Sequence, residues 1–225
     1  MDYSKPTLIL ISGPPGAGKS TFGKTLLPDA FEGISPFDRD ATMTKYEQEL
    51  IGSYDDPDEI ANRAFIKMER QLIDEMATAI QHKAHYALET PLHFPDYWEE
   101  YINPFLNNGY QIQLSYICLD NLSDCEARVH HRANTGGHWL PLDTIEEVYK
   151  NSLPLLEANA HLLTAINLYD GMKTPTLLAN IENGLVVHAE PEALTKNWIT
   201  HGLPTLAAKI SKHLPPPKIS NRIKL

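Results

Sequence analysis

Cysteine is scarce in this sequence, and long apolar runs and an excess of basic residues are lacking. Its 225 residues include two cysteines, Cys118 and Cys125, which excludes a disulfide-stapled scaffold and favours a reducing compartment. No apolar stretch approaches the roughly 20 residues that a membrane-spanning helix needs. The formal net charge of -10 disfavours binding to a nucleic-acid backbone or an anionic membrane. We therefore expect neither as a partner, while a local basic cleft for phosphorylated small molecules stays compatible with the total charge.

Internal repeats and long linkers are missing as well. The chain has 225 residues, 42% of them hydrophobic, which predicts one domain with a substantial core. We expect residues 1–170 to form the core of this domain, and residues 171–225 to add a hairpin, a short helix and an extended tail. The first apolar run, residues 7–12, is too short and too early for a signal peptide. A cytoplasmic location is therefore expected.

Short apolar runs alternate with longer amphipathic patterns along the chain. The apolar runs predict strands at residues 7–12, 86–89, 112–119 and 165–169, with a weaker candidate at 33–37. Helices are predicted from the glycine-rich loop to residue 27, and at 58–82, 96–107, 123–132 and 142–163, the last with a kink at Pro154. This alternation predicts an α/β fold with a doubly wound, mainly parallel sheet flanked by helices. Ligands of such folds bind at the carboxyl ends of the strands.

A glycine-rich loop follows the first predicted strand. The stretch "ISGPPGAGKSTF" contains Gly13-x-x-x-x-Gly18-Lys19-Ser20, a complete P-loop pattern between a strand and a helix. Glycines let backbone N–H groups converge on phosphates, a lysine bridges the β- and γ-phosphates, and a P-loop serine binds Mg²⁺. The predicted fold is therefore of the P-loop NTPase type, with ATP and Mg²⁺ as expected ligands. The predicted nucleotide-binding residues are Gly13, Pro14, Pro15, Gly16, Ala17, Gly18, Lys19, Ser20 and Thr21.

Three classes of protein use such a loop, and the chain favours one of them. A GTPase switch normally carries Asn-Lys-x-Asp after a strand, and neither Lys150-Asn151 nor Lys196-Asn197 has that context. A motor ATPase carries a strand ending in Asp-Glu, whereas Asp120 is followed by Asn121. A small-molecule kinase needs an acidic residue after the second strand, and "SPFDRDATM" supplies it. A kinase is predicted, and an ATPase or nucleotide-binding regulatory module remains the alternative.

Several further blocks resemble the zeta toxin family of P-loop kinases. They are "GPPGAGKSTF", "FDRD", "ALET", "GYQIQLSYICL", "EARVHHRANTGGHWLP" and "INLYDG", and they span residues 7–170. The Arg-rich helix with Gly-Gly-His-x-x-Pro is the most specific of these blocks. The resemblance implies a kinase that uses ATP and Mg²⁺ to phosphorylate a hydroxyl of UDP-N-acetylglucosamine or a related sugar nucleotide. An antitoxin protein stays open as a partner.

The resemblance assigns roles where residues match. Asp40 of "FDRD" falls on the family's general base for the acceptor hydroxyl, and Glu89 falls on an acidic residue near Mg²⁺ and the substrate. Arg128 and Arg132 share one helical face and would stabilise the transferring phosphoryl group together with Lys19. A plain surface charge is the alternative for Arg132. His138 would contact ATP or serve as a structural residue of the Gly-Gly-His lid segment.

The acceptor side departs from the family pattern. After Glu89 the family continues with threonines or Gly-Thr, whereas this chain has "TPLH". Thr90 and His93 are candidates for substrate binding beside Asp40 and Glu89, but Pro91 removes a backbone N–H. The acceptor therefore stays open between a sugar nucleotide and another small hydroxyl compound, such as a nucleoside, a nucleotide or an antibiotic.

The metal is expected at Ser20 and Asp38. For Asp38, helix capping is the alternative. We also expect Asp38 to point away from the cleft that Asp40 faces, because alternate residues at a strand end point in opposite directions. Specificity residues are expected in 43–63, a segment that gives no decisive pattern.

Overall fold

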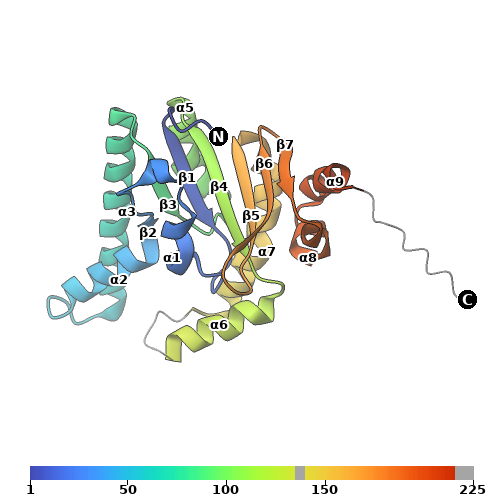
Figure 1. Cartoon of the computed structure of the whole chain (residues 1–225). Helices are drawn as coiled ribbons and strands as arrows, with labels where there is room; N and C mark the ends of the chain where they lie inside the picture. Colours follow the sequence, from blue (N-terminus) through green and yellow to red (C-terminus); the bar gives the residue numbers. More distant parts are fainter. Residues whose placement is uncertain (135–139, 216–225) are drawn as a thin grey trace, which may run out of the picture.

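The computed structural model describes residues 1–134 and 140–215, and within them a seven-stranded sheet runs through the molecule (Figure 1). The strand order is β2-β3-β1-β4-β5-β6-β7. Strands β1 to β5 pair in parallel, and β6 and β7 pair antiparallel. The predicted doubly wound, mainly parallel sheet is therefore confirmed. The strands are β1 (Thr7–Ser12), β2 (Phe37–Asp38), β3 (Tyr86–Glu89), β4 (Gln111–Cys118), β5 (Ala165–Asp170), β6 (Thr176–Glu182) and β7 (Leu185–Ala189).

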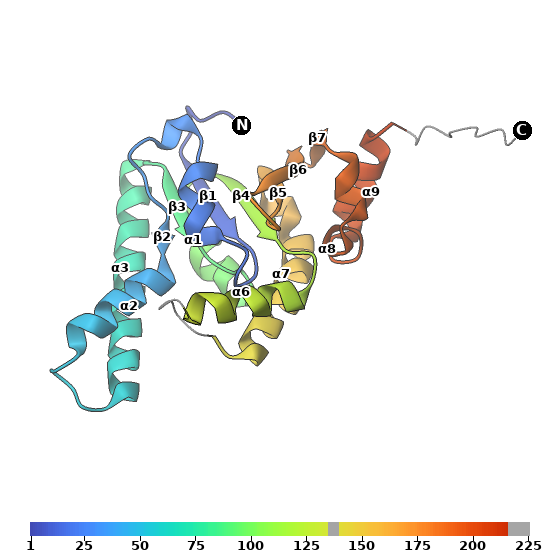
Figure 2. The same cartoon turned by 60° about the horizontal axis from the view of Figure 1, so that its bottom comes forward.

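Helices lie on both faces of this sheet (Figures 1 and 2). The long helix α3 lies at the β3 side, α7 lies behind the sheet, and α6 lies across the carboxyl ends of the parallel strands. The α-helices are α1 (Lys19–Phe22), α2 (Arg39–Leu50), α3 (Pro57–His82), α4 (Pro95–Tyr97), α5 (Asn103–Asn107), α6 (Leu122–Asn134), α7 (Leu142–Asn159), α8 (Asn197–Thr200) and α9 (Pro204–His213). Short 3-10 turns are η1 (Gly23–Leu26), η2 (Asp29–Phe31), η4 (Ala160–Leu162) and η5 (Pro191–Thr195), and a π-helical turn, η3 (Trp98–Ile102), joins α4 to α5.

The central strand β1 is buried on both faces. All six of its residues are buried, as expected of an uninterrupted apolar run between two layers of helices. Leu8 and Leu10 join a core cluster with residues of α3, α5, α7, α8 and α9. Ile9 and Ile11 join a second cluster with residues of η2 and α6 and the start of α7. The alternation of side chains along the strand thus divides the core between the two layers.

Several helix predictions needed correction. The P-loop helix is α-helical only to Phe22 and continues to Leu26 as a 3-10 turn. The predicted helix at 96–107 is split into α4, a π-helical turn and α5. Helix α7 runs through Pro154 and ends at Asn159, four residues earlier than predicted. The weak strand candidate at 33–37 is a two-residue strand at Phe37–Asp38.

Residues beyond 170 continue the sheet. The predicted hairpin is present as β6 and β7, and its turn residues Asn183 and Gly184 have φ values of 50° and 75°, as a tight hairpin turn requires. Because β6 pairs with β5 and Trp198 and Ile199 of α8 are buried in the larger cluster, residues 171–215 pack on the core. The division at residue 170 stays a prediction, and most of the predicted tail lies outside the described residues.

None of the helices in the described ranges is both long enough and apolar enough to cross a membrane.

Candidate active site

The glycine-rich loop has a backbone that its sequence requires. Gly13, Gly16 and Gly18 have φ values of 140°, 79° and 93°, a region that favours glycine. A Cβ added at Gly13 would lie 1.9 Å from the carbonyl oxygen of Ile117, so no larger residue fits there without a shift of β4. The loop joins buried β1 to the N-terminus of α1, which is the geometry of a phosphate cradle.

Lys19 and Ser20 occupy the first turn of α1. The Lys19 ammonium donates hydrogen bonds to the carbonyl oxygens of Gly13 and Pro14, at 2.9 and 3.1 Å. The Ser20 hydroxyl donates to Glu89 Oε1 at 2.9 Å. The loop's cation and hydroxyl therefore lie at the same end of the sheet as the acidic residue that closes β3.

Three carboxylates gather where β2 and β3 end. Asp38 pairs in register with Glu89 across these strands, and Asp40 follows in the first turn of α2. Asp38 Oδ1 accepts a hydrogen bond from the backbone N–H of Ala41 at 2.9 Å, so the alternative of a helix cap is confirmed for Asp38. The expectation that Asp38 points away from the cleft is wrong, because it lines the cleft together with Asp40. The chain turns into α2 immediately after Asp38, so strand alternation does not apply to the pair.

Glu89 has the most perturbed carboxyl of this group. It is 8% exposed, and its pKa is raised from 4.5 to about 7, with burial as the largest cause. Asp38 and Asp40 add to this rise, while Lys19 and the Ser20 hydrogen bond oppose it. Perturbed carboxyls of this kind are concentrated at functional sites.

This pKa predicts that Glu89 destabilises the fold at neutral to alkaline pH. The contribution of Glu89 to the free energy of unfolding is fully present below about pH 4.5 and is lost as the pH rises through about 7. By pH 8 the loss amounts to about 3 kcal/mol. Glu89→Gln removes the charge and keeps an acceptor for Ser20. In urea unfolding we expect Glu89→Gln to have a larger free energy of unfolding than the unsubstituted protein at pH 8. Near pH 4.5 the two free energies of unfolding should be almost equal. A difference of equal size at both pH values would show that ionisation of Glu89 is not its cause.

A cleft of about 750 Å³ joins these elements. It is lined by residues of the glycine-rich loop, α1, α2, α3, α6, α7 and the segment after β3. The predicted residues that line it are Pro15, Gly16, Gly18, Lys19, Ser20, Thr21, Asp38, Asp40, Glu89, His93, Arg128 and Arg132. Nucleotide, metal and acceptor candidates from separate parts of the sequence therefore face one space.

Four of the predicted residues that the structure describes are not part of this lining: Gly13, Pro14 and Ala17 of the glycine-rich loop, and Thr90. Thr90 is fully buried, its N–H donates to the carbonyl oxygen of Ile11 at 3.1 Å, and it does not line the cleft. Its hydroxyl is buried and has no hydrogen-bond partner within the described part of the chain. His138 lies outside the described residues, so its role stays a prediction.

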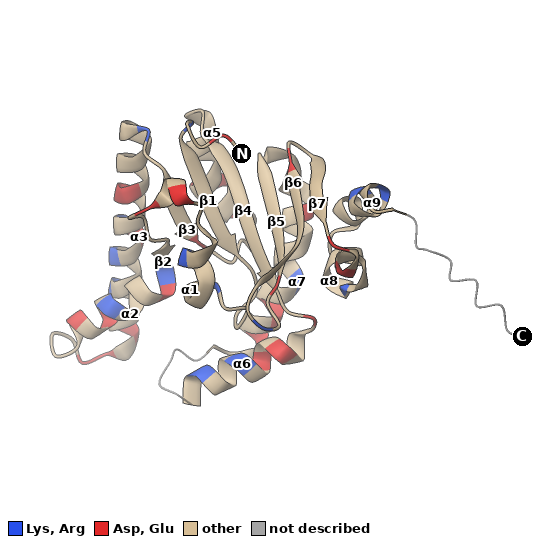
Figure 3. Cartoon of the chain, viewed as in Figure 1, with Lys and Arg blue, Asp and Glu red and all other residues tan. Residues whose placement is uncertain are grey.

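Arg128 connects α6 to the glycine-rich loop. Its guanidinium donates to the carbonyl oxygens of Gly16 at 3.3 Å, Gly171 at 2.8 Å and Met172 at 2.6 Å. Arg132 lies one helical turn later and lines the same cleft. Figure 3 shows these basic positions on α6, while acidic positions mark the connection between α2 and α3. The cleft thus brings Lys19, Arg128 and Arg132 to face its three carboxylates, in a chain of formal net charge -10.

Arg39 is a cleft residue that the sequence did not reveal. It forms an ion pair with Glu69 of α3, and its guanidinium lies 5.0 Å from the ring centroids of both Tyr97 and Tyr101. Its Nη1 is buried and finds no hydrogen-bond partner among the described residues. The only signal in the sequence was its position between the two aspartates of "FDRD".

His93 lines the cleft as a neutral ring. Burial, together with the positive charges of Arg39 and Lys19, lowers its pKa from 6.5 to about 4. Its ring lies 3.9 Å from that of Phe94, and its Nδ1 is buried without a partner in the described ranges. An uncharged His93 can donate or accept one hydrogen bond but brings no positive charge for a phosphate.

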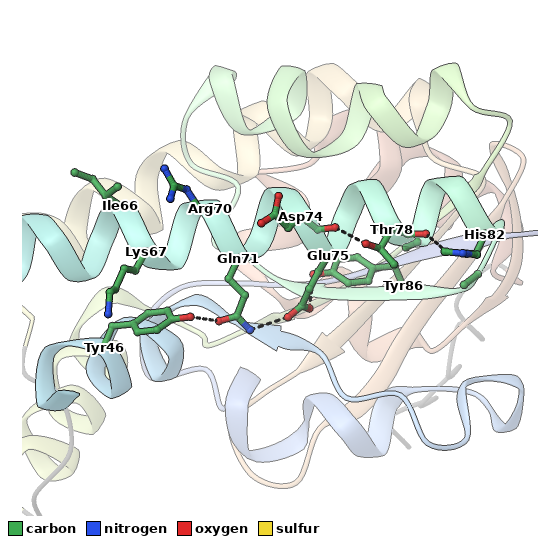
Figure 4. A pocket seen from close by; sticks show the side chains of 12 residues that line it. Tyr46, Ile66, Lys67, Arg70, Gln71, Asp74, Glu75, Thr78, His82 and Tyr86 are labelled. Carbon is green, nitrogen blue, oxygen red and sulfur yellow. Dashed lines mark hydrogen bonds between the residues drawn. The ribbon is translucent and has the colours of Figure 1, made fainter. Parts of the chain in front are cut away.

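A second cavity, of about 880 Å³, lies along the outer side of α3 (Figure 4). Four of its polar side chains form one chain of hydrogen bonds. The Tyr46 hydroxyl donates to Gln71 at 2.7 Å, Gln71 donates to Glu75 at 2.7 Å, and the Tyr86 hydroxyl donates to Glu75 at 3.3 Å. The cleft at the glycine-rich loop is the stronger candidate, because predicted site residues from α1, β2, α2, β3 and α6 line it.

Comparisons with known proteins agree with this architecture. A family model described as an AAA domain matches residues 8–153. No match was found among curated proteins. Among solved structures, the AvrRxo1-ORF1:AvrRxo1-ORF2 complex is similar in crystals with sulphate ions (TM-score 0.63, 15% identity) and with ATP (TM-score 0.62, 15% identity). These matches cover 85% and 86% of this chain, and 63% of the matched chain in both cases.

A third similar structure comes from the PezAT chromosomal toxin-antitoxin system of Streptococcus pneumoniae. Its TM-score is 0.56 at 19% identity, and the match covers 92% of this chain and 88% of the PezAT chain. At these identities the likeness extends to the fold. The chain spans about 63% of the length of the AvrRxo1 chains that it matches.

Proposed function

Because the chain belongs to the AAA domain family, we propose that it is an ATP-dependent kinase of the zeta toxin type. It transfers the γ-phosphoryl group of ATP to a hydroxyl of a sugar nucleotide, and UDP-N-acetylglucosamine or a related UDP-sugar is the acceptor. The observation that carries the proposal is the shared cleft, in which the glycine-rich loop, Asp40, Glu89 and Arg128 face one another. Phosphoryl transfer needs few other protein groups, because positioning and charge stabilisation dominate its catalysis.

Each residue has a role in this proposal. The glycine-rich loop and Lys19 hold the β- and γ-phosphates. Asp40 accepts the proton of the acceptor hydroxyl as that oxygen attacks the γ-phosphorus, and the bond from the γ-phosphorus to the β–γ bridging oxygen breaks to release ADP. Arg128 and Arg132 donate hydrogen bonds to the phosphoryl oxygens as charge spreads onto them. Glu89 and His93 orient the acceptor.

The residues near Ser20 fit a magnesium ion. Ser20 donates to Glu89 at 2.9 Å, and Asp38 and Asp40 raise the pKa of Glu89 further, so a cation here would relieve repulsion between carboxylates. In the described part of the chain no group of three His, Cys, Asp or Glu side chains is arranged to hold a metal. Mg²⁺ is usually held by one or two protein groups together with substrate phosphates and water. When bound, Mg²⁺ supplies charge neutralisation at the phosphates.

The test is direct product analysis. The protein is incubated with ATP, Mg²⁺ and UDP-N-acetylglucosamine, and mass spectrometry is expected to show an acceptor heavier by one phosphoryl group. ADP release is measured in parallel with and without a panel of UDP-sugars. ADP release that no acceptor accelerates would instead favour an ATPase or a regulatory nucleotide-binding module. Phosphorylation of a different hydroxyl compound would support the kinase activity and contradict the sugar-nucleotide assignment.

One observation favours a small hydroxyl acceptor other than a sugar nucleotide. The acceptor side of the cleft includes Pro91, the neutral His93 and the apolar side chains of Met43, Phe65 and Met68. A diphosphate normally finds cationic side chains or backbone N–H groups, and the Arg39 guanidinium on this side is already paired with Glu69. A nucleoside or an antibiotic hydroxyl therefore remains the alternative acceptor.

A protein partner and a cytoplasmic location complete the proposal. PezAT is a toxin-antitoxin system, and AvrRxo1-ORF1 is crystallised with AvrRxo1-ORF2. By analogy, an antitoxin protein is proposed as a partner of this chain.

A further inference from the structure

Lys196 lies at the junction of η5 and α8, beyond the residues that the family model matches. It is 8% exposed, and its ammonium contacts three carboxylates. Asp170 Oδ2 lies at 2.6 Å, Asp120 Oδ1 at 3.1 Å and Glu192 Oε1 at 3.5 Å. Asp170 closes β5 and Asp120 follows β4, so one cation joins the carboxyl ends of two parallel strands.

The turn after β5 is held by Asp170. Its other carboxylate oxygen, Oδ1, accepts a hydrogen bond from the N–H of Met172 at 2.9 Å. The N–H of Gly171 donates to the carbonyl oxygen of Cys118 in β4 at 2.8 Å. A Cβ added at Gly171 would lie 3.0 Å from the carbonyl oxygen of Ala17, so this turn also packs against the glycine-rich loop.

Arg128 is bound to the same turn. Two of its three carbonyl acceptors are Gly171 and Met172, and the third is Gly16. A continuous set of contacts therefore runs from Lys196 through Asp170 and the Gly171–Met172 turn to the guanidinium of Arg128.

We propose that Lys196 is a positioning residue for Arg128 and acts through Asp170 and the Gly171–Met172 turn. The inference rests on the proposed function, because it takes Arg128 to act on the transferring phosphoryl group. It goes beyond that function by giving the segment after the matched family region a part in catalysis.

Charge explains why a cation is needed at this position. Burial alone would lower the pKa of Lys196, but hydrogen bonds to Asp170 and Asp120 outweigh it and hold the pKa above its usual value. Without Lys196, Asp170 loses its partner, and Arg128, bonded to the next two residues, becomes an ion-pair partner for it. Capture of Arg128 by Asp170 would move its guanidinium away from the phosphoryl group.

The first test compares two lysine variants of the full chain. Lys196→Met should lower kcat on the order of 10- to 100-fold, the effect of a catalytic group displaced by about 1 Å, with little change in the KM for ATP. Lys196→Arg should restore part of the activity, because arginine can also pair with both aspartates. The matched control is Lys209→Met, which removes a lysine of α9 whose ammonium donates to the carbonyl oxygen of Gly184. Unchanged kcat in Lys196→Met, or an equal loss in Lys209→Met, would overturn the inference.

Coupling to Arg128 is the second test. In an Arg128→Ala background, Lys196→Met should cost little further activity, because a positioning residue has no effect once the residue that it positions is gone. Independent, multiplicative losses would show that Lys196 acts elsewhere, and would overturn the inference.

The third test needs no kinase activity. The side-chain ¹⁵Nε signal of Arg128, assigned by its loss in Arg128→Lys, should shift in Lys196→Met and stay in place in Lys209→Met. A shift in a protein that phosphorylates no acceptor would support the positioning contact and contradict the proposed function. An unshifted signal in an active kinase would contradict the positioning contact and support the proposed function.

Discussion

Asp40→Asn should keep its affinity for ATP and lose phosphoryl transfer by a factor on the order of 10²–10⁴, the usual contribution of a general base. Asparagine has the size and polarity of aspartate but cannot accept the proton of the attacking hydroxyl. Asp40 is exposed in the first turn of α2 and lines the cleft, so the change leaves the core untouched. ATP binding is measured by titration calorimetry and transfer by ADP release with the acceptor present.

Asp38→Asn is the matched control for this experiment. Asp38 caps α2 by accepting from the N–H of Ala41, and asparagine is an equally good N-cap residue. We expect a much smaller loss of transfer than for Asp40→Asn. If the two variants lost transfer equally, Asp40 would not be the base, and the acidic residues would be acting together through their charge.

Arg128→Ala should lower kcat on the order of 10³-fold while the KM for ATP changes little. An arginine that stabilises charge on the transferring group contributes mainly in the transition state. Arg128 faces the cleft from α6, and its guanidinium is anchored on three carbonyl oxygens, which reduces the entropy lost when it binds a phosphoryl oxygen. Steady-state kinetics with varied ATP separates the two parameters.

The same carbonyl contacts require a stability control for Arg128→Ala. Removing the guanidinium leaves the carbonyl oxygens of Gly171 and Met172 without this donor, which costs some stability. Thermal unfolding of the variant without nucleotide should show a modest decrease, too small to unfold the protein at assay temperature. A raised KM for ATP with unchanged kcat would instead identify Arg128 as a ground-state anchor for the nucleotide.

The sequence predicted the phosphate cradle and the sheet around it for physical reasons that are local. The run of Thr7–Ser12 is apolar at every position but its ends, which is typical of a strand covered on both faces, and the spacing of Gly13, Gly18 and Lys19 specifies the loop that follows it. Asn183 and Gly184 predicted a tight turn, because both residues tolerate positive φ. Such features depend on residues within a few positions of one another.

Other parts could not be predicted, because distant residues determine them. Helix α2 buries only Leu50, so its sequence lacks the apolar stripe that identifies an amphipathic helix. Arg39 enters the cleft because Glu69, Tyr97 and Tyr101 hold it there. Thr90 was predicted as a substrate-binding residue from its place after Glu89, but the strand continues its pairing for one more residue and buries it.

The order of the strands also constrains how the protein folds. Strand β1 ends at Ser12, yet its two partners, β3 and β4, begin at Tyr86 and Gln111. Pairings between such distant segments form slowly, because a long loop of chain must close before any contact stabilises it. A ribosome adding about 5–20 residues per second completes the glycine-rich loop well before it completes β4. Ile117, whose carbonyl oxygen packs against Gly13, is therefore synthesised long after the glycine-rich loop. The loop acquires its native shape only after most of the sheet has emerged.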